Sequence, residues 1–451
     1  MIRPNKIIVV GGNAAGPAAA ARARRVNPNA EVILFEAGNF ISTGTCEMPY
    51  VLSGDIKDHS EIIFFSPESF FRKKGVKVFI NHSVEEINTK ENEISVRNGD
   101  KNKSVTFNYD TLILCTGSTA RILPQFNAEL NNVFTLKNIS DLIGIKNYIN
   151  KNNVSKAVII GSGYIGLEAA EAISKIGIKV TLLEKEDQPM PTGEPELKQK
   201  ILSLIKNNEI EFIGSIDDIE PVIYDGVVKS IKLGDDYIDT DLIILSVGFS
   251  PNTFLAQQAK LELGRFSGIK VDKKLTTSNS RIFAAGDNCE VVNAVTGKLD
   301  YIPLATTAYT YGHIAGENAS GGNLSSEPVV KNAAVKFFDQ YFAFVGLTSN
   351  EAERARIEFN SVTVKVPNIV KVMPGSREVF GKLIFEKSNQ RILGASFYGG
   401  TEVSGYADLV SSLIKLKQDA EALTKINYNY TPPLSPFINP LYLLGKKAKS
   451  V

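Results

Sequence analysis

The chain has 451 residues and a formal net charge of +1, with the 43% hydrophobic and 22% charged residues typical of a globular protein of two or three domains. The balanced charge gives no support for nucleic-acid binding, and three scattered cysteines with three histidines argue against a disulfide framework or a metal centre. The N-terminus lacks a signal-peptide core and no apolar run could cross a bilayer, so we expect a cytoplasmic protein with reduced thiols and no membrane contact.

Residues near the N-terminus have the order of a dinucleotide-binding unit. A β-branched run over residues 6–10 predicts a buried parallel strand, residues 18–25 an Ala-rich helix, and residues 31–35 a second strand that ends at an acid. The intervening turn is a Gly-x-Asn-x-x-Gly fingerprint, whose glycines allow close approach of the backbone to a pyrophosphate. The acid can accept a hydrogen bond from a ribose hydroxyl. The residues expected to contact this dinucleotide are Gly11, Asn13, Ala14, Ala15, Gly16 and Glu36.

A cysteine follows this unit in a polar, glycine-containing stretch, residues 42–50. Cys46 lacks the apolar run that adjoins Cys115, and a presented thiol is what a thiolate nucleophile requires. Taken alone, Cys46 is more simply an incidental loop thiol. The neighbouring nucleotide motifs favour the nucleophile.

The dinucleotide pattern recurs in the middle of the chain. Residues 156–160 predict a strand, residues 167–176 a helix, and residues 179–183 a strand that ends at Glu184. A carboxylate there favours the free 2′-hydroxyl of NADH over the phosphate of NADPH, although Lys185 beside it weakens the preference. Two such units in one chain predict one flavin and one nicotinamide cofactor. The expected contacts in the second unit are Gly161, Gly163, Ile165, Gly166 and Glu184.

Three further strand ends carry nucleotide-site signals. Strands over residues 109–114 and 241–245 are followed by Gly117 and Gly248, where we expect the chain to cross between two nucleotide domains. A strand that ends in Gly-Asp places Asp287 to bond a flavin ribityl chain. A helix predicted from Pro303 to residue 318 puts the free N–H groups of its first turn, at Ala305, toward an electron-rich ring edge.

The C-terminal part has no nucleotide fingerprint. A flexible composition over residues 321–326 predicts a domain boundary. Beyond it we predict an α+β domain, with strands over residues 333–346, 361–366 and 380–385 and an amphipathic helix over residues 408–416.

Residues 45–50, 161–168, 282–287 and 430–435 together carry a resemblance that covers nearly the whole chain. The chain resembles the single-cysteine branch of the pyridine nucleotide-disulfide oxidoreductase family, closest to coenzyme A-disulfide reductases and persulfide reductases, with NADH oxidases and NADH peroxidases as relatives. The resemblance implies an α/β fold with two Rossmann-like dinucleotide-binding domains and a C-terminal α+β dimerisation domain, in a homodimer. The implied boundaries are 1–118 with 249–322 for FAD, 119–248 for NADH, and 329–451 for dimerisation.

In this family Cys46 would be the redox centre beside the flavin. No second cysteine lies near it, and the C-terminal His-Pro pair of two-cysteine enzymes is replaced by Ser435-Pro436, which excludes an intramolecular disulfide cycle. Cys46 would instead cycle through a mixed disulfide, a persulfide or a sulfenic acid. Ala14 stands where the peroxidases carry a histidine, which favours a disulfide or persulfide acceptor over peroxide.

Other residues take roles from the same resemblance. Tyr430 matches a tyrosine that a partner subunit contributes, or it is a packing aromatic at a dimer interface, whereas a second family tyrosine is replaced by Met373. Arg22 and Arg25 match phosphate ligands of coenzyme A, or they form a solvated helix face.

Two residues on the second helix also match the family. Tyr164 would shield the flavin until NADH enters, and Glu168 would shape the pocket. The proton donor is left open between Tyr430 and a water molecule. The physiological acceptor is also open, since an NADH oxidase or peroxidase that uses a Cys46 sulfenate, and a flavin-based redox sensor with little turnover, both remain alternatives.

Overall fold

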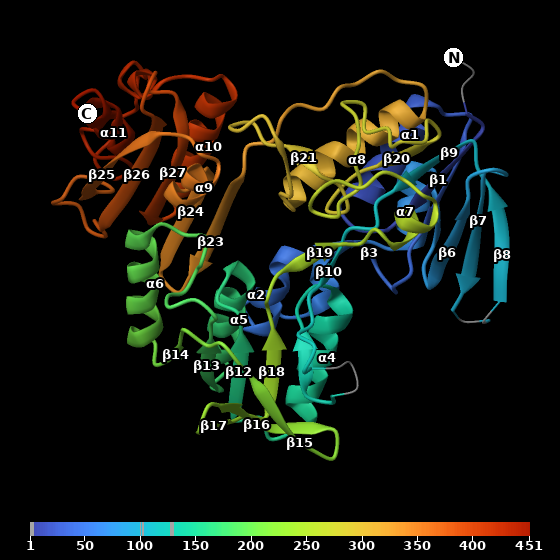
Figure 1. Ribbon diagram of the computed structural model, residues 1–451, viewed down its shortest axis with the longest axis horizontal. Helices are drawn as coiled ribbons and strands as arrows, with labels where there is room; N and C mark the ends of the chain where they lie inside the picture. The colour runs from blue at the N-terminus through green and yellow to red at the C-terminus, as the bar shows by residue number, and fades with distance from the viewer. Residues whose placement is uncertain (1–3, 100, 102, 127–129) are drawn as a thin grey trace.

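The structure, a computed structural model, describes residues 4–99, 101, 103–126 and 130–451. Three five-stranded sheets with their helices form three regions of the molecule (Figure 1). The first sheet is parallel and has the strand order β20-β9-β1-β2-β5. Its strands are β20 (Ile282–Ala284), β9 (Thr111–Leu114), β1 (Lys6–Val10), β2 (Glu31–Phe35) and β5 (Lys77–Phe79).

Both faces of the first sheet are covered, which explains the continuous apolar run of β1. Ile7 and Val9 pack toward α1 (Ala15–Val26) and α8 (Ala305–Ala319), whereas the alternate residues of β1 pack toward an antiparallel sheet on the other face. Gly312 lets the two helices touch, because a Cβ atom there would lie 2.2 Å from the Ala15 carbonyl oxygen. The antiparallel sheet consists of β6 (His82–Asn88), β7 (Glu93–Asn98) and β8 (Lys103–Asn108).

The second parallel sheet repeats the topology, with the order β11-β18-β12-β13-β14. An antiparallel two-stranded ribbon, β10 (Ser118–Ala120) with β19 (Phe249–Pro251), lies between the two parallel sheets (Figure 1). The sheet strands are β11 (Val133–Thr135), β18 (Leu242–Leu245), β12 (Lys156–Ile160), β13 (Lys179–Leu183) and β14 (Glu211–Ile213). Helices α4 (Ile139–Lys151), α5 (Tyr164–Lys175) and α6 (Pro195–Asn207) belong to this region, as do the antiparallel strands β15 (Glu220–Tyr224), β16 (Val227–Leu233) and β17 (Asp236–Asp239).

The third sheet is antiparallel, in the order β23-β24-β27-β26-β25. One face packs under α10 and α11, and the other meets the second nucleotide region, where Phe344 and Phe380 share a core with Leu167 and Leu197. Its elements are β23 (Asn332–Phe337), β24 (Gln340–Gly346), α9 (Ser349–Arg354), β25 (Phe359–Pro367), β26 (Glu378–Glu386), β27 (Ile392–Gly399), α10 (Glu402–Lys415), η3 (Ala420–Thr424) and α11 (Pro440–Ala448).

Short elements join these parts. They are β3 (Ile41–Thr43), η1 (Thr45–Glu47), α2 (Met48–Leu52), η2 (His59–Ile62), β4 (Ile63–Phe65), α3 (Pro67–Lys74), α7 (Phe254–Gln258), β21 (Val291–Val292) and β22 (Leu299–Asp300). Across the described ranges, no helix combines the length and apolarity that a membrane crossing requires.

The fold class predicted from the sequence is confirmed, with corrections to individual elements. The predicted strand over residues 333–346 is a hairpin of β23 and β24, because the chain turns at Phe338 with a positive φ of 53°. The predicted helix over residues 408–416 begins earlier, at Glu402. Pro303 precedes α8 rather than entering its first turn, and β27 was not predicted.

Candidate redox site between two nucleotide cradles

Cys46 lies in η1, between β3 and α2, and its side chain is exposed. The short helix α2 that follows is held from the other side, because Met48, Val51 and Leu52 are buried in a core shared with α4 and α5. The segment formed by η1 and α2 is therefore a rigid turn rather than a free loop, and the exposed thiol is held in place by the buried residues that follow it. Cys115, by contrast, is buried, and burial raises the pKa of its thiol.

The charges around Cys46 come from several elements. Although the Cys46 side chain reaches the surface, protein atoms packed around its sulfur raise the pKa of the thiol, the carboxylates of Glu47 and Glu168 raise it further, and Lys137 lowers it. The pKa of Glu168 on α5 is itself raised to about 7, by burial and then by the charge of Glu171. Sequence reasoning assigned Glu168 only to the shape of the pocket, and the structure adds a carboxyl group that titrates near neutrality.

The first fingerprint forms a tight cradle at the end of β1. Gly11 has a φ of 108°, and a Cβ atom there would lie 2.1 Å from the Cys115 carbonyl oxygen, so the turn requires glycine. Glu36, at the end of β2, accepts a hydrogen bond from the Gly12 N–H at 2.6 Å. Gly16 lies against Gly11, where a Cβ atom would lie 1.8 Å from its carbonyl oxygen. The backbone of the turn is thereby free to face a phosphate.

This cradle is tied to the redox segment. The Asn13 side-chain oxygen accepts hydrogen bonds at 3.2 Å from both the N–H and the hydroxyl of Thr43, which ends β3. Ala14 caps α1 with a strained φ of 23°, and Ala15 opens the helix in a buried position.

The second fingerprint repeats this geometry. Gly161 has a φ of 99°, and Glu184 accepts from the N–H and the hydroxyl of Ser162 at 2.8 and 2.5 Å. A Cβ atom at Gly166 would lie 1.9 Å from the Gly161 carbonyl oxygen. Gly163 caps α5, and Ile165 lies in its first turn. The Tyr164 ring packs edge-on against Phe344 of the third sheet, with ring centres 5.6 Å apart.

Asp287 collects polar groups from both nucleotide regions. Its carboxylate accepts a hydrogen bond from the Ser118 hydroxyl at 3.1 Å and pairs with Lys137 at 3.5 Å. The Lys137 ammonium also lies 4.3 Å from the centre of the Phe249 ring. Sequence reasoning missed Ser118 and Lys137. The sequence signal for Ser118 was its position directly after the predicted domain crossing at Gly117. The signal for Lys137 was its position just after β11.

The remaining predicted residues lie around this group or away from it. Gly117 and Gly248 have positive φ and flank the β10–β19 ribbon, and Ala305 opens α8. Arg22 is paired with Glu317 of α8 at 2.5 Å, and Arg25 is exposed. Tyr430 is exposed in the third region, where its ring packs edge-on against Phe437.

These features fit the two expected cofactors. Each cradle joins a glycine turn at a helix start, which offers N–H donors, with an accepting carboxylate at the end of the next strand, the combination found in dinucleotide sites. FAD fits the first cradle, because Asp287 follows β20 of the same sheet and the Cys46 segment adjoins the cradle. NADH fits the second cradle. Fold and site thus define an FAD-dependent oxidoreductase that draws electrons from a nicotinamide cofactor.

Comparison with known proteins gives the family. Residues 5–312 match the pyridine nucleotide-disulphide oxidoreductase family, and residues 332–440 match its dimerisation domain. The chain belongs to this family. It is 30% identical to an NADH oxidase from Methanocaldococcus jannaschii over 98% of each chain, and 30% identical to a coenzyme A disulfide reductase from Staphylococcus aureus over 98% of this chain and 100% of that one. A solved NAD-dependent persulfide reductase from A. fulgidus matches 99% of this chain and 83% of its own, with a TM-score of 0.94 and 28% identity.

Proposed function

We propose that this enzyme passes electrons from NADH, through FAD and the single thiol of Cys46, to a small disulfide or persulfide such as coenzyme A disulfide. One observation carries the proposal: Cys46 is exposed, whereas Cys115 and Cys289 are buried. Cys46 lies on a rigid turn that follows Thr43, and Thr43 is hydrogen-bonded to Asn13 of the first cradle. A lone accessible thiol has no intramolecular partner, so its disulfide partner must come from the acceptor.

The chemistry at sulfur follows from this arrangement. The Cys46 thiolate attacks one sulfur of the acceptor, the acceptor S–S bond breaks, and the released thiolate takes a proton. A mixed disulfide with Cys46 remains, and two electrons cleave it to release the second thiol and restore Cys46. These two electrons would be supplied by NADH through the bound FAD. Gly11, Glu36 and Asp287 would hold FAD, and Gly161 and Glu184 would hold NADH.

A homodimer completes the site in this proposal. Tyr430 belongs to the dimerisation domain, so Tyr430 of a second copy would approach Cys46 and assist the leaving thiol. The exposed apolar side chains of Leu434 and Phe437 near it support an interface there. The domain boundaries 1–118 with 249–322, 119–248 and 329–451 are part of the same proposal, as is a cytoplasmic location, because a nucleophilic thiol must stay reduced.

Two arginines on α1 support coenzyme A as the carrier. Arg25 is exposed on α1, and the pKa of His313 on α8 is lowered by burial and then by the charges of Arg22 and Arg25. Arg25 and Arg22, the latter oriented by Glu317, would receive the phosphates of coenzyme A, and His313 with its lowered pKa would take part only as a neutral hydrogen-bond donor.

The second candidate is an NADH oxidase, favoured by the relative of that name and by the exposure of Cys46. In that reaction oxygen or peroxide would oxidise Cys46 to a sulfenate. Ala14 beside the cradle offers no imidazole to stabilise the sulfenate, which is why the disulfide reaction stands first.

A panel of acceptors tests the proposal. Steady-state NADH oxidation is measured with coenzyme A disulfide, a coenzyme A persulfide, polysulfide, oxygen and peroxide, for wild type, Cys46→Ser and the buried-thiol control Cys115→Ala. We expect disulfide or persulfide turnover that is lost in Cys46→Ser and kept in Cys115→Ala, while NADH still bleaches the flavin in all three. Faster turnover with oxygen would favour the oxidase, and slow turnover with every acceptor would favour a redox sensor.

A further inference from the structure

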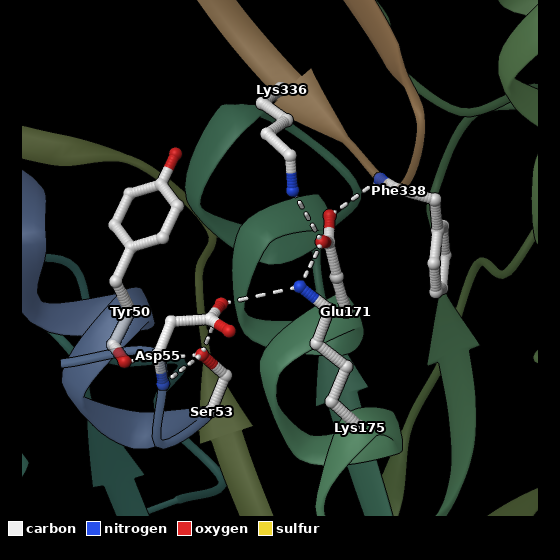
Figure 2. A network of polar contacts seen from close by, with 7 residues as sticks. All are labelled: Tyr50, Ser53, Asp55, Glu171, Lys175, Lys336 and Phe338. Carbon is white, nitrogen blue, oxygen red and sulfur yellow. Dashed lines mark hydrogen bonds and ion pairs between the residues drawn. The ribbon is translucent and has the colours of Figure 1, made fainter. Parts of the chain in front are cut away.

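A buried carboxylate joins the second nucleotide region to the dimerisation domain. Glu171 of α5 is 8% exposed, and its Oε2 accepts a hydrogen bond from the N–H of Phe338 at 2.6 Å. Its Oε1 lies 3.2 Å from the ammonium of Lys336 on β23 and 2.8 Å from that of Lys175 on its own helix (Figure 2). One carboxylate therefore satisfies three donors, two of which come from the β23–β24 hairpin.

The contacts continue from Glu171 to the redox segment. Lys175 also pairs with Asp55 at 3.3 Å, and Asp55 lies just beyond α2. The Ser53 hydroxyl is 2.9 Å from the Asp55 carboxylate and 3.1 Å from the carbonyl oxygen of Tyr50, inside α2 (Figure 2). A chain of polar contacts thus runs from the dimerisation domain, across α5, to the helix that directly follows Cys46.

A second buried carboxylate offers a matched comparison. Glu194 is 1% exposed and accepts from the N–H of Ser349 at 2.6 Å, and it pairs with Lys382 at 2.7 Å. Like Glu171, it holds a lysine and a backbone N–H of the dimerisation domain. The side-chain partners of Glu194 are Ser349 and Lys382, so it joins the same two regions without reaching the redox segment.

We propose that Glu171 is a positioning residue of the redox site, which fixes the Cys46 segment to the dimerisation domain through Lys175 and Asp55. The proposal rests on the role of Cys46 proposed above. In a dimer built by that domain, the same contacts would align Cys46 with the residues of the second copy. Turnover with an acceptor would depend on this alignment, whereas flavin reduction by NADH would not.

The charged and titratable groups that face Glu171 define what a charge change can disturb. On α5 they include Glu168, whose raised pKa has the Glu171 charge as its second cause after burial. Removal of that charge lowers the pKa of Glu168. The facing groups are Glu168 and Lys175 of α5, Lys336 of β23, Tyr50 of α2, and Asp55 beyond α2.

The test compares Glu171→Gln and Asp55→Asn with the control Glu194→Gln in the FAD-loaded full chain. Three quantities are measured: kcat with coenzyme A disulfide, the rate of flavin bleaching by NADH, and the pH profile of Cys46 alkylation. We expect Glu171→Gln and Asp55→Asn to lower kcat roughly tenfold, as a misplaced reacting group does, with bleaching unchanged. In Glu171→Gln the inflection that Glu168 causes should also move downward by about half a pH unit. Glu194→Gln should change neither kcat nor the profile.

Each outcome decides the proposal. Equal losses of kcat in Glu171→Gln and Glu194→Gln would mean that Glu171 only joins the two regions, and this result would overturn the proposal. Normal kcat in Asp55→Asn would do so as well, and that partly exposed variant still reports if Glu171→Gln fails to fold. Turnover that survives Cys46→Ser would instead refute the proposed function, and the alkylation profile would still report on Glu171.

Discussion

Glu184 receives two hydrogen bonds from one residue, Ser162, whose N–H lies 2.8 Å and whose hydroxyl lies 2.5 Å from the same carboxylate oxygen. The carboxylate is buried at the end of β13, beside the second glycine turn. It is therefore fixed in place before any nucleotide binds, at the position where a ribose hydroxyl is expected. In the first cradle, the Glu36 carboxylate likewise accepts a hydrogen bond from the N–H of Gly12.

The fixed carboxylate predicts a preference for NADH over NADPH. Glu184→Gln should narrow the preference about fivefold, because loss of one nearby charge changes binding of a phosphate by on the order of 1 kcal/mol. Glu184→Arg should narrow or reverse it. The ratio of kcat/KM for the two nucleotides measures the effect, and Glu36→Gln, in the other cradle, should leave this ratio unchanged. A wild-type preference for NADPH would contradict the role of Glu184.

The two glycine turns predict separable losses of cofactor. The purified protein should be yellow, with about one FAD per chain. Gly11→Ala should lose FAD, because the new Cβ would meet the Cys115 carbonyl oxygen at 2.1 Å. Gly161→Ala, whose Cβ would meet the Ser246 carbonyl oxygen at 2.5 Å, should keep FAD and weaken NADH binding. Absorbance spectra and NADH titrations distinguish the two, and equal flavin loss in both variants would contradict the assignment of the cradles.

The charges near Cys46 predict opposite effects of two substitutions on thiol reactivity. Glu168 raises the pKa of Cys46 and Lys137 lowers it. At about pH 8, Glu168→Gln should therefore increase the thiolate fraction and speed alkylation roughly threefold, and Lys137→Gln should slow it by a similar factor. The gain in Glu168→Gln should vanish as the pH falls below about 7, because the wild-type carboxyl is then protonated.

Iodoacetamide alkylation of the reduced protein checks both signs, with Cys46→Ser as the background. The buried Cys115 and Cys289 have raised pKa values and should contribute little. Changes of the same sign in Glu168→Gln and Lys137→Gln would refute the electrostatic account of the site.

The exposed apolar side chains near Tyr430 predict the dimer interface. Leu434 and Phe437 are 75% and 78% exposed in the single chain, so an aspartate at either position should weaken self-association. We expect Phe437→Asp to give monomers that lose disulfide turnover and keep flavin reduction by NADH. Tyr224→Asp is the matched control, since Tyr224 is 74% exposed on β15 of the second nucleotide region and lies outside the dimerisation domain. Light scattering gives the mass, and a fully active wild-type monomer would exclude a role for Tyr430 of a second copy.

Sequence patterns located the parallel strands β1, β2, β9, β12, β13, β18 and β20 and both glycine turns because those signals are local, whereas the three-residue edge strands β5, β11 and β14 were not predicted. In β1 the residues from Ile7 to Val10 are all apolar because both faces of the strand are covered, and the end of the strand is set by Gly11. Phe338 illustrates the opposite case. No glycine marks its left-handed turn, and the longest break in the apolar pattern is only the polar pair Asp339-Gln340 that follows, so residues 333–346 were taken as one strand. The roles of the individual site residues remain predictions.

Contacts between distant parts of the chain were beyond the reach of sequence patterns. Lys137 meets Asp287 only because β11 and β20 end near each other, and Glu171 meets Phe338 only through the docking of a hairpin. The helix α2 is five residues long, too short to be stable alone, and it forms because its apolar side packs on α4 and α5.

That packing of α2 has a consequence for the modularity of the enzyme. Met48 and Leu52, from the N-terminal region, share one apolar core with helices of the second nucleotide region and with Phe344 of the dimerisation domain. Severing the chain at the β10–β19 ribbon would leave this core open on each fragment. The three regions therefore cannot be exchanged independently. A nicotinamide-binding region taken from another protein would have to provide the same apolar packing surface for α2 before it could act together with Cys46.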